Sequence, residues 1–221
     1  MTFWNPLKEA LEFLGDEKIA AQQKAYMRDQ YEFYGCKAPT ISSALNEFYK
    51  ENKATSWEEL KDQILWTWKQ PQREWQMIGM KYLQKMKKLW GDDLISFSEE
   101  LVTSKSWWDT VDFLATNVVG KYLEKKPIYA EEIMTEWNYS DDMWKQRTSI
   151  IFQLKYKDEV NTKFLSEAIL RHEDSTEFFI RKAQGWALRQ YSRFNPEWVE
   201  EFLDQNTQLS GLTRREGGKF L

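Results

Sequence analysis

The chain has 221 residues, of which 42% are hydrophobic and 30% charged, and its mean hydropathy is −0.72. This length and balance fit a globular or elongated fold with a sizeable core, so we expect one domain over residues 1–221. The net charge of −4 excludes a generally basic surface, so any nucleic-acid contact has to be local. Twelve tryptophans are an unusually large number and call for a role beyond core filling.

The single cysteine, Cys36, and the single histidine, His172, exclude several kinds of site. An internal disulfide needs two cysteines, and the common iron and zinc motifs need more histidines or cysteines than the chain has. A Cys36–His172 nucleophilic dyad is one alternative, although a lone buried thiol is more common. No glycine-rich phosphate loop is present, and we expect neither a metal nor an organic cofactor.

The N-terminal residues carry no basic region followed by an apolar core, and no stretch reads as a membrane span. Together with the single cysteine, this favours a cytoplasmic protein with no membrane partner. We also expect a monomer.

Helix signals follow one another along almost the whole chain, and the alternating pattern of strands is absent. Asn5-Pro6 starts the first helix, Gly35 is suited to end the second, and Ser56 with Glu59 forms a capping-box pattern. The tail after Ser210 is expected to fray. The predicted helices span residues 5–14, 16–34, 41–49, 56–70, 73–90, 93–102, 106–123, 129–137, 141–154, 161–170 and 175–193, and a last one starts at 195.

The longer helices begin at a nearly fixed period along the chain. Their starts are placed at Arg73, Trp107, Met143 and Phe178, which are separated by 34, 36 and 35 residues, and a shorter helix precedes each one. Such a period with two helices per unit is typical of a helical solenoid of HEAT type. We therefore predict an all-α superhelix whose second helices line a concave face.

One stretch, from Lys105 to Asp112, suggests a reactive site. Ser106 is placed as the N-cap of a helix, which puts Trp108 and Asp112 four residues apart on one face. An indole beside a carboxylate suits a cleft in which a positive charge develops. The alternative is that Trp108 belongs to the core and Asp112 is a solvated helix residue, and the helix pattern alone favours this alternative.

Positive charge is concentrated toward the C-terminal half. Residues 143–193 contain ten Lys or Arg against six Asp or Glu, most of them on two successive long helices. A basic face on an acidic protein is what contact with phosphates requires, although an ordinary solvated helix surface gives the same pattern.

Four segments together resemble the AlkD-like DNA alkylation repair family, along nearly the whole chain. They are KSWWDTVD at 105–112, WKQR at 144–147, FQLKYK at 152–157 and EFFIRKAQGWALR at 177–189. The resemblance implies a right-handed α-α superhelix of HEAT-like repeats with a concave DNA-binding face. It also implies a monofunctional DNA glycosylase that removes cationic N3- or N7-alkylated purines from duplex DNA without flipping the base.

The resemblance also implies roles for individual residues. The catalytic group falls on Trp108, Asp112 and Trp186: the carboxylate would supply negative potential beside C1′, and the indoles would hold the deoxyribose. Lys37 departs from the polar amide that the family carries near that position. The expected DNA contacts are Tyr26, Lys37, Lys105, Arg147, Lys155, Lys182 and Arg189. A DNA-binding relative without catalysis and a protein-interaction scaffold are the competing functions.

Overall fold

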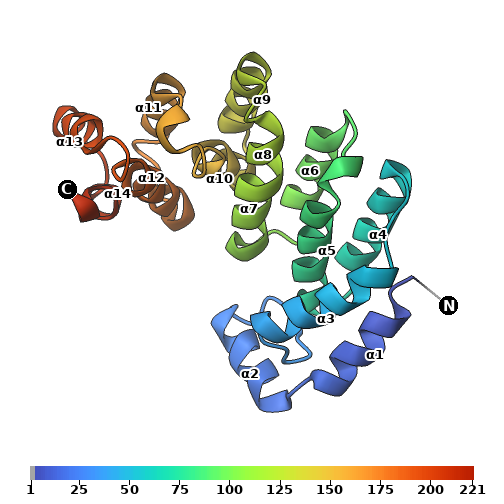
Figure 1. Ribbon diagram of the computed structural model, residues 1–221. Coiled ribbons are helices and arrows are strands. Elements are labelled where there is room, and N and C mark those ends of the chain that lie inside the picture. The colour runs from blue at the N-terminus through green and yellow to red at the C-terminus, as the bar shows by residue number, and fades with distance from the viewer. Residues whose placement is uncertain (1–2) are drawn as a thin grey trace. The chain divides into compact units, whose positions relative to one another are not determined.

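A computed structural model of the protein describes residues 3–221 (Figure 1). The chain divides into two compact units, Met1–Phe97 and Ser98–Leu221, and each is described by itself. The described residues form helices and no strand; one isolated bridge joins Glu32 to Gln72. The predicted all-α class is therefore confirmed, whereas a single domain over residues 1–221 stays a prediction.

Unit 1 is built from helices that pack as neighbours, with α1 against α3 and α4 against α5. The short loop between α4 and α5 is closed by Gln76, whose side-chain amide donates to the carbonyls of Thr67 and Gln70 at 2.7 and 3.1 Å. The elements are α1 (Asn5–Leu14), α2 (Glu17–Tyr26), α3 (Ala38–Glu51), α4 (Trp57–Lys69), α5 (Arg73–Lys85), η1 (Lys87–Leu89) and the start of α6 (Leu94–Thr103).

Unit 2 contains a row of three helices, α7, α10 and α12, in which α10 packs against both of the others (Figure 1). This row carries most of the residues to which the sequence assigns chemistry. After the end of α6 the elements are α7 (Trp108–Leu114), η2 (Ala115–Val119), α8 (Gly120–Leu123), α9 (Pro127–Tyr139), α10 (Met143–Ile151), η3 (Lys157–Glu159), α11 (Thr162–Leu170), α12 (Phe178–Tyr191), α13 (Pro196–Gln205), α14 (Gly211–Gly217) and η4 (Gly218–Phe220).

The predicted repeat is confirmed and is more regular than expected. Helices α5, α7, α10 and α12 begin at Arg73, Trp108, Met143 and Phe178, so each start lies 35 residues after the one before. Each of these is the second helix of a pair, and the first helix of the pair precedes it. The curvature of the chain and its concave face stay predictions.

The helix predicted over residues 106–123 begins later and contains an irregular turn. Ser106 is not its N-cap, because the Ser106 hydroxyl donates to the Val102 carbonyl at the end of α6 (2.6 Å) and Trp107 takes the cap position. Beyond α7 the backbone widens into the π-helical η2, where the Thr116 hydroxyl donates to the Asp112 carbonyl at 2.8 Å. Such π-turns are rare and occur frequently at functional sites.

The second predicted helix, residues 16–34, is wrong beyond Tyr26. The chain leaves the helix there because Arg28 and Asp29 adopt left-handed φ angles of 56° and 57°. A buried carboxylate, Glu74, holds the following loop by accepting the backbone N–H groups of residues 34, 35 and 36 at 3.2, 2.9 and 3.1 Å. Glu74 lies on α5, some forty residues away along the chain, so the local sequence of the loop could not predict this contact.

The C-terminal tail does not fray as predicted. Helix α14 packs closely along α12, and a Cβ on Gly185 would lie 2.5 Å from the Cβ of Glu216. The buried Thr213 hydroxyl donates to the side-chain carbonyl of Gln184 at 2.8 Å. The missing side chain at Gly185 therefore lets the tail complete the core of unit 2.

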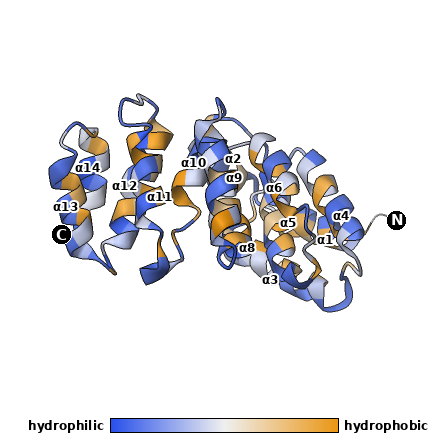
Figure 2. Ribbon diagram, turned by 90° about the horizontal axis from the view of Figure 1, so that it is seen from above, coloured by the Kyte–Doolittle hydropathy of each residue, from blue (hydrophilic) through white to orange (hydrophobic). Residues whose placement is uncertain are grey.

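Four of the twelve tryptophans are buried in cores. In unit 1, Trp4 and Trp75 are 1% and 0% exposed, and Trp4 stacks on Phe48 with centroids 5.1 Å apart. Figure 2 shows the helices striped in orange and blue, as expected when each helix buries one face. Among residues 3–221, no helix has the length and apolarity needed to cross a bilayer.

The close contact between α8 and α10 yields a test of the packing. We expect Gly120→Ala to lower the free energy of unfolding by about 1–3 kcal/mol, because its new Cβ would lie 2.2 Å from the Phe152 carbonyl oxygen. Gly211→Ala is the matched control, since nothing lies within 4 Å of a Cβ there. Urea unfolding of both variants gives the comparison, and equal stabilities would contradict the close packing.

Candidate active site

A nearly buried ion pair joins two neighbouring helices of unit 2. Asp112 on α7 accepts two N–H bonds from Arg147 on α10, from Nε to Oδ1 at 2.7 Å and from Nη2 to Oδ2 at 2.8 Å. This fork matches the planar guanidinium to both carboxylate oxygens, which is the strongest form of such a pair. The pair was not anticipated from the sequence, where the two residues had separate roles.

The same guanidinium reaches a third helix. Its Nη1 donates to the backbone carbonyl of Phe179 on α12, and its carbon lies 5.8 Å from the centre of the Phe179 ring. That ring lies 5.1 Å from Trp144 and 5.3 Å from Trp107, measured between centroids. Arg147 therefore joins α7, α10 and α12 to one another, and it lies next to a cluster of aromatic rings.

The repeat explains why these residues meet. Asp112, Arg147 and Lys182 each occupy the fifth position of their helix, because α7, α10 and α12 begin 35 residues apart. Equivalent positions of stacked repeats lie next to one another. A search for opposite charges spaced by one repeat would have found the Asp112–Arg147 pair in the sequence.

The two ends of the ion pair differ in their access to solvent. The Asp112 side chain is 14% exposed and that of Arg147 only 5%. Burial raises the pKa of Asp112 above its usual value, and the hydrogen bonds and charge of Arg147 oppose that rise. Each carboxylate oxygen also keeps acceptor capacity beyond the one bond to arginine. The end of the pair nearer the surface is therefore the anionic one.

The two expected cleft tryptophans lie on the outer helices of the row. Trp108 is the first residue of α7, one turn before Asp112, and Trp186 lies in the middle of α12; both are half-buried. Neither is fully buried, whereas the alternative that Trp108 belongs to the core required full burial of that residue. The bracketing of Asp112 by the two indoles stays a prediction.

The phosphate contact expected of Arg147 stays a prediction. Its guanidinium is buried and donates to Asp112 and to Phe179, so it does not present an exposed cation to a phosphate. The resemblance placed a cation at the correct position, but the structure gives it an internal partner. Its observed contacts are those of a residue that positions Asp112.

Two other expected DNA contacts share one acidic partner. Lys182 and Arg189, both on α12, lie 3.0 and 2.7 Å from the carboxylate of Glu216 on α14. Lys182 foremost, with Arg189, lowers the pKa of Glu216. All three side chains are partly exposed. Sequence reasoning missed Glu216 because it lies in the tail that was expected to fray.

The remaining expected DNA contacts lie nearer the surface. Lys105 adopts a left-handed φ of 49° in the turn before α7, and the exposed Lys155 donates to the side chain of Asn117 in η2 at 2.5 Å. In unit 1, Tyr26 ends α2 with 72% exposure, and Lys37 is an exposed residue at the N-cap of α3.

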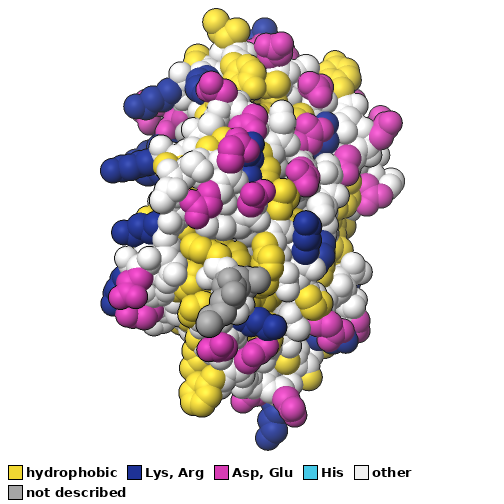
Figure 3. Space-filling model, turned by 90° about the vertical axis from the view of Figure 1, so that its right-hand side faces the viewer, with side chains coloured by type: hydrophobic (Ala, Val, Ile, Leu, Met, Phe, Trp, Pro, Cys, Tyr) yellow, Lys and Arg dark blue, Asp and Glu magenta, His cyan; other side chains and the backbone are white. Residues whose placement is uncertain are grey.

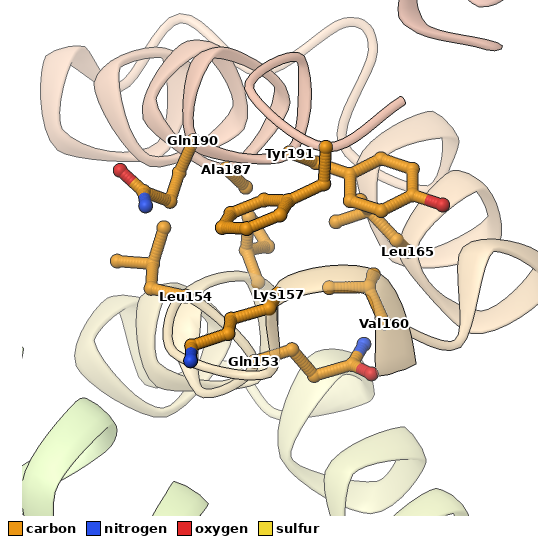
Figure 4. A pocket seen from close by; sticks show the side chains of 10 residues that line it. Gln153, Leu154, Lys157, Val160, Leu165, Ala187, Gln190 and Tyr191 are labelled. Carbon is orange, nitrogen blue, oxygen red and sulfur yellow. The ribbon is translucent and has the colours of Figure 1, made fainter. Parts of the chain in front are cut away.

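A crevice between the α10 and α12 segments is too small to be a ligand site. It encloses about 10 Å³, roughly the space of one water, among side chains that include Lys157 and Gln190 (Figure 4). Pockets for small molecules are usually about 300–1,000 Å³. Within residues 3–221 no group of three or more His, Cys, Asp or Glu side chains is arranged to hold a metal ion.

The lone thiol takes no part in this chemistry. Cys36 is buried in unit 1, where its Sγ donates to the Leu11 carbonyl, and burial raises its pKa to about 11. The His172 ring contacts the Asn138 carbonyl at 3.0 Å, and burial lowers its pKa. A thiol held in its protonated form does not suit the nucleophilic dyad.

The buried pair predicts a pattern of stabilities. Arg147→Met leaves an unpaired buried carboxylate, so we expect it to lower the free energy of unfolding by about 3–5 kcal/mol. Arg147→Met combined with Asp112→Leu should recover most of that loss, because no charge is then left buried. Urea unfolding gives both values; a double variant no more stable than the single one would contradict the pairing.

Comparison with known proteins shows the family to which the chain belongs. The sequence profile of a family described as DNA alkylation repair enzyme matches residues 7–221. A solved structure described as a predicted DNA alkylation repair enzyme from Enterococcus faecalis is 32% identical, with a TM-score of 0.86 over 94% of this chain and 96% of that chain. A search of curated proteins gives no match. The chain belongs to the DNA alkylation repair enzyme family.

Proposed function

We propose that the protein is a monofunctional DNA glycosylase that hydrolyses the N-glycosidic bond of cationic N3- or N7-alkylated purines in duplex DNA. The observation that carries the proposal is the carboxylate of Asp112, which is held by two hydrogen bonds from Arg147 and is the less buried end of that pair. Membership of the DNA alkylation repair family supplies the substrate class at the level of damaged DNA.

The chemistry needs little from the protein beyond electrostatics. Alkylation at N3 or N7 makes the purine cationic, so the base departs without a strong acid, and the sugar becomes oxocarbenium-like. A fixed carboxylate beside C1′ stabilises that charge and orients the attacking water, as carboxylates do in glycoside hydrolysis. Asp112 suits this role because its oxygens keep acceptor capacity after Arg147 has bound them.

The two half-buried indoles add to the same effect. Trp108 and Trp186 present aromatic faces that attract a developing positive charge, a contribution of about 0.5–2 kcal/mol for each ring. They also hold the deoxyribose in place, which limits the motion of the reacting carbon. In this role both are catalytic residues together with Asp112.

The purine stays in the duplex in this proposal. Most glycosylases extrude the target base into a fitted pocket. In this proposal Asp112 instead acts on the sugar from the backbone side, with the base left in the stack. Adducts that project from the duplex then meet no enclosing wall.

Contact with the DNA backbone falls to cations and one tyrosine at the surface. We assign this role to Lys105, Lys155, Lys182 and Arg189, with Tyr26 and Lys37 from unit 1. Such contacts fix the register of the protein on the duplex without reading its sequence. Lys182 and Arg189 exchange Glu216 for phosphate in this proposal, so Glu216 is the group that limits their affinity.

A DNA-binding protein without catalysis is the competing function. The observation in its favour is again the ion pair, because Arg147 offsets much of the negative charge that Asp112 would offer to the sugar. The two functions differ in one readout, the release of free base from alkylated DNA.

Base release from duplex DNA containing N7-methylguanine is the decisive measurement. We expect the protein to release the free base and Asp112→Asn to slow release by about 10²–10³-fold, the usual effect of removing one such electrostatic group. Glu99→Gln is the matched control, because it breaks a different ion pair of α10, the one between Glu99 and Lys145 at 2.6 Å. Equal loss in both variants would point to a folding defect, and salt-sensitive binding without release would favour the competing function.

The pH dependence provides a second readout of the same residue. The rate should fall on acidification as Asp112 takes up a proton, and it should do so above the ordinary aspartate value of 3.8, because burial raises the pKa of Asp112. Asp112→Asn should lose this acid limb altogether. Rates are compared after the uncatalysed release at each pH is subtracted, and an unchanged profile in the variant would remove Asp112 from the mechanism.

The Glu216 pairing predicts tighter DNA binding when it is removed. In Glu216→Gln the cations Lys182 and Arg189 lose their internal partner, so undamaged duplex should bind more tightly and with a steeper salt dependence. Each added phosphate contact steepens the slope of log K against log salt by about 0.9. Anisotropy titrations at several salt concentrations measure the slope; an unchanged slope would exclude these two cations from the interface.

A further inference from the structure

Unit 1 contains a large open groove between α1 and α3, separate from the proposed chemistry. Its volume is about 680 Å³. The floor includes the core residues Leu7 and Phe48, which are 2% and 7% exposed. Figure 3 looks at the side of the molecule on which α1 lies and shows exposed yellow side chains between magenta ones. The side chains that line the groove are thus both apolar and polar, and its charged lining residues are acidic.

The walls of the groove are regular enough to receive a third helix. On α1, Pro6, Ala10 and Leu14 recur every fourth residue and so share one face of the helix. On α3, Thr40 and Ala44 form the facing row. These side chains are mostly small, which lets the backbone of an added helix approach closely.

Apolar side chains are also left exposed where α1 ends. Leu14 is 45% exposed and Phe13 is 88% exposed, although phenylalanine is normally buried. Leu14 lines the groove, and exposed apolar surface beside a groove commonly marks an interaction site. The end of the groove therefore offers anchoring contacts for an apolar side chain.

The charges of the groove specify the partner. Its two charged lining residues, Glu47 and Glu51, lie four apart on α3, a spacing at which like charges repel. They also lie in the last two turns of α3, where the helix dipole favours cations. Lys50 pairs with Glu47 at 2.6 Å and offsets only part of this unfavourable negative charge. A cationic ligand would offset the remainder.

We propose that the groove between α1 and α3 binds an amphipathic helix of another protein, with an apolar stripe on one face and Lys or Arg along its edge. The apolar stripe would lie on Ala10, Leu14 and Ala44, and the cations would meet Glu47 and Glu51. This is the helix-in-groove mode of recognition. The acidic lining repels nucleic acid, so this surface is independent of the proposed DNA contacts.

A pair of synthetic peptides tests the proposal on the full chain. One is a labelled Leu/Lys amphipathic helix, and the other keeps the leucines and replaces each lysine with glutamate. We expect the Leu/Lys peptide to bind about tenfold or more tightly than the Leu/Glu peptide in anisotropy titrations. Ala44→Arg, which fills the groove, should weaken the Leu/Lys peptide to a similar degree.

Charge reversal separates the groove from the overall acidity of the protein. The variant Glu47→Lys/Glu51→Lys should lose the Leu/Lys peptide, whereas Glu131→Lys/Glu132→Lys on the exposed side of α9 changes the net charge equally and should retain it. Equal weakening by both pairs, or equal affinity for both peptides, would overturn the proposal. Concentration-dependent self-association that Ala44→Arg abolishes would assign the groove to a second copy of the chain instead.

Discussion

The contact on which the candidate site depends is the fork between Arg147 and Asp112. It joins α7 to α10, and the third donor of the same guanidinium reaches the Phe179 carbonyl on α12. Because both charged groups are largely removed from water, neither helix moves away without leaving an unpaired buried charge. The position of the carboxylate is therefore fixed by the packing of three helices, before any substrate binds.

This arrangement follows from the repeat. The second helix of each repeat begins 35 residues after the second helix of the repeat before it. Asp112, Arg147 and Lys182 therefore occupy the same position in three successive repeats. The next acidic group comes from outside the period, since Glu216 on α14 binds Lys182 and Arg189. Four cations of the basic segment, Lys145, Arg147, Lys182 and Arg189, are thus paired with carboxylates of unit 2.

Errors in the sequence-based expectations share a physical origin. Residues 30–36 form a loop, although the second helix was predicted to run to residue 34, and Glu74, far along the chain, holds that loop by accepting three of its backbone N–H groups. The tail is ordered because Gly185 leaves room for α14 to lie against α12. Ser106 fails as a cap because its hydroxyl is already bonded to the end of α6. In each case a tertiary contact outweighed a local preference.

The sequence by itself determined the all-helical class, the 35-residue period and the helix that carries Trp108 and Asp112, because apolar spacing and turn residues act over short distances. Tertiary structure decided which cations are free. Arg147 was expected from the sequence to bind a phosphate, but in the structure it is buried and pairs with Asp112. Lys182 and Arg189 both pair with Glu216. The reason is that a charged side chain pairs with the opposite charge that lies nearest to it in space. In a stacked helical repeat that partner lies about one repeat away along the chain.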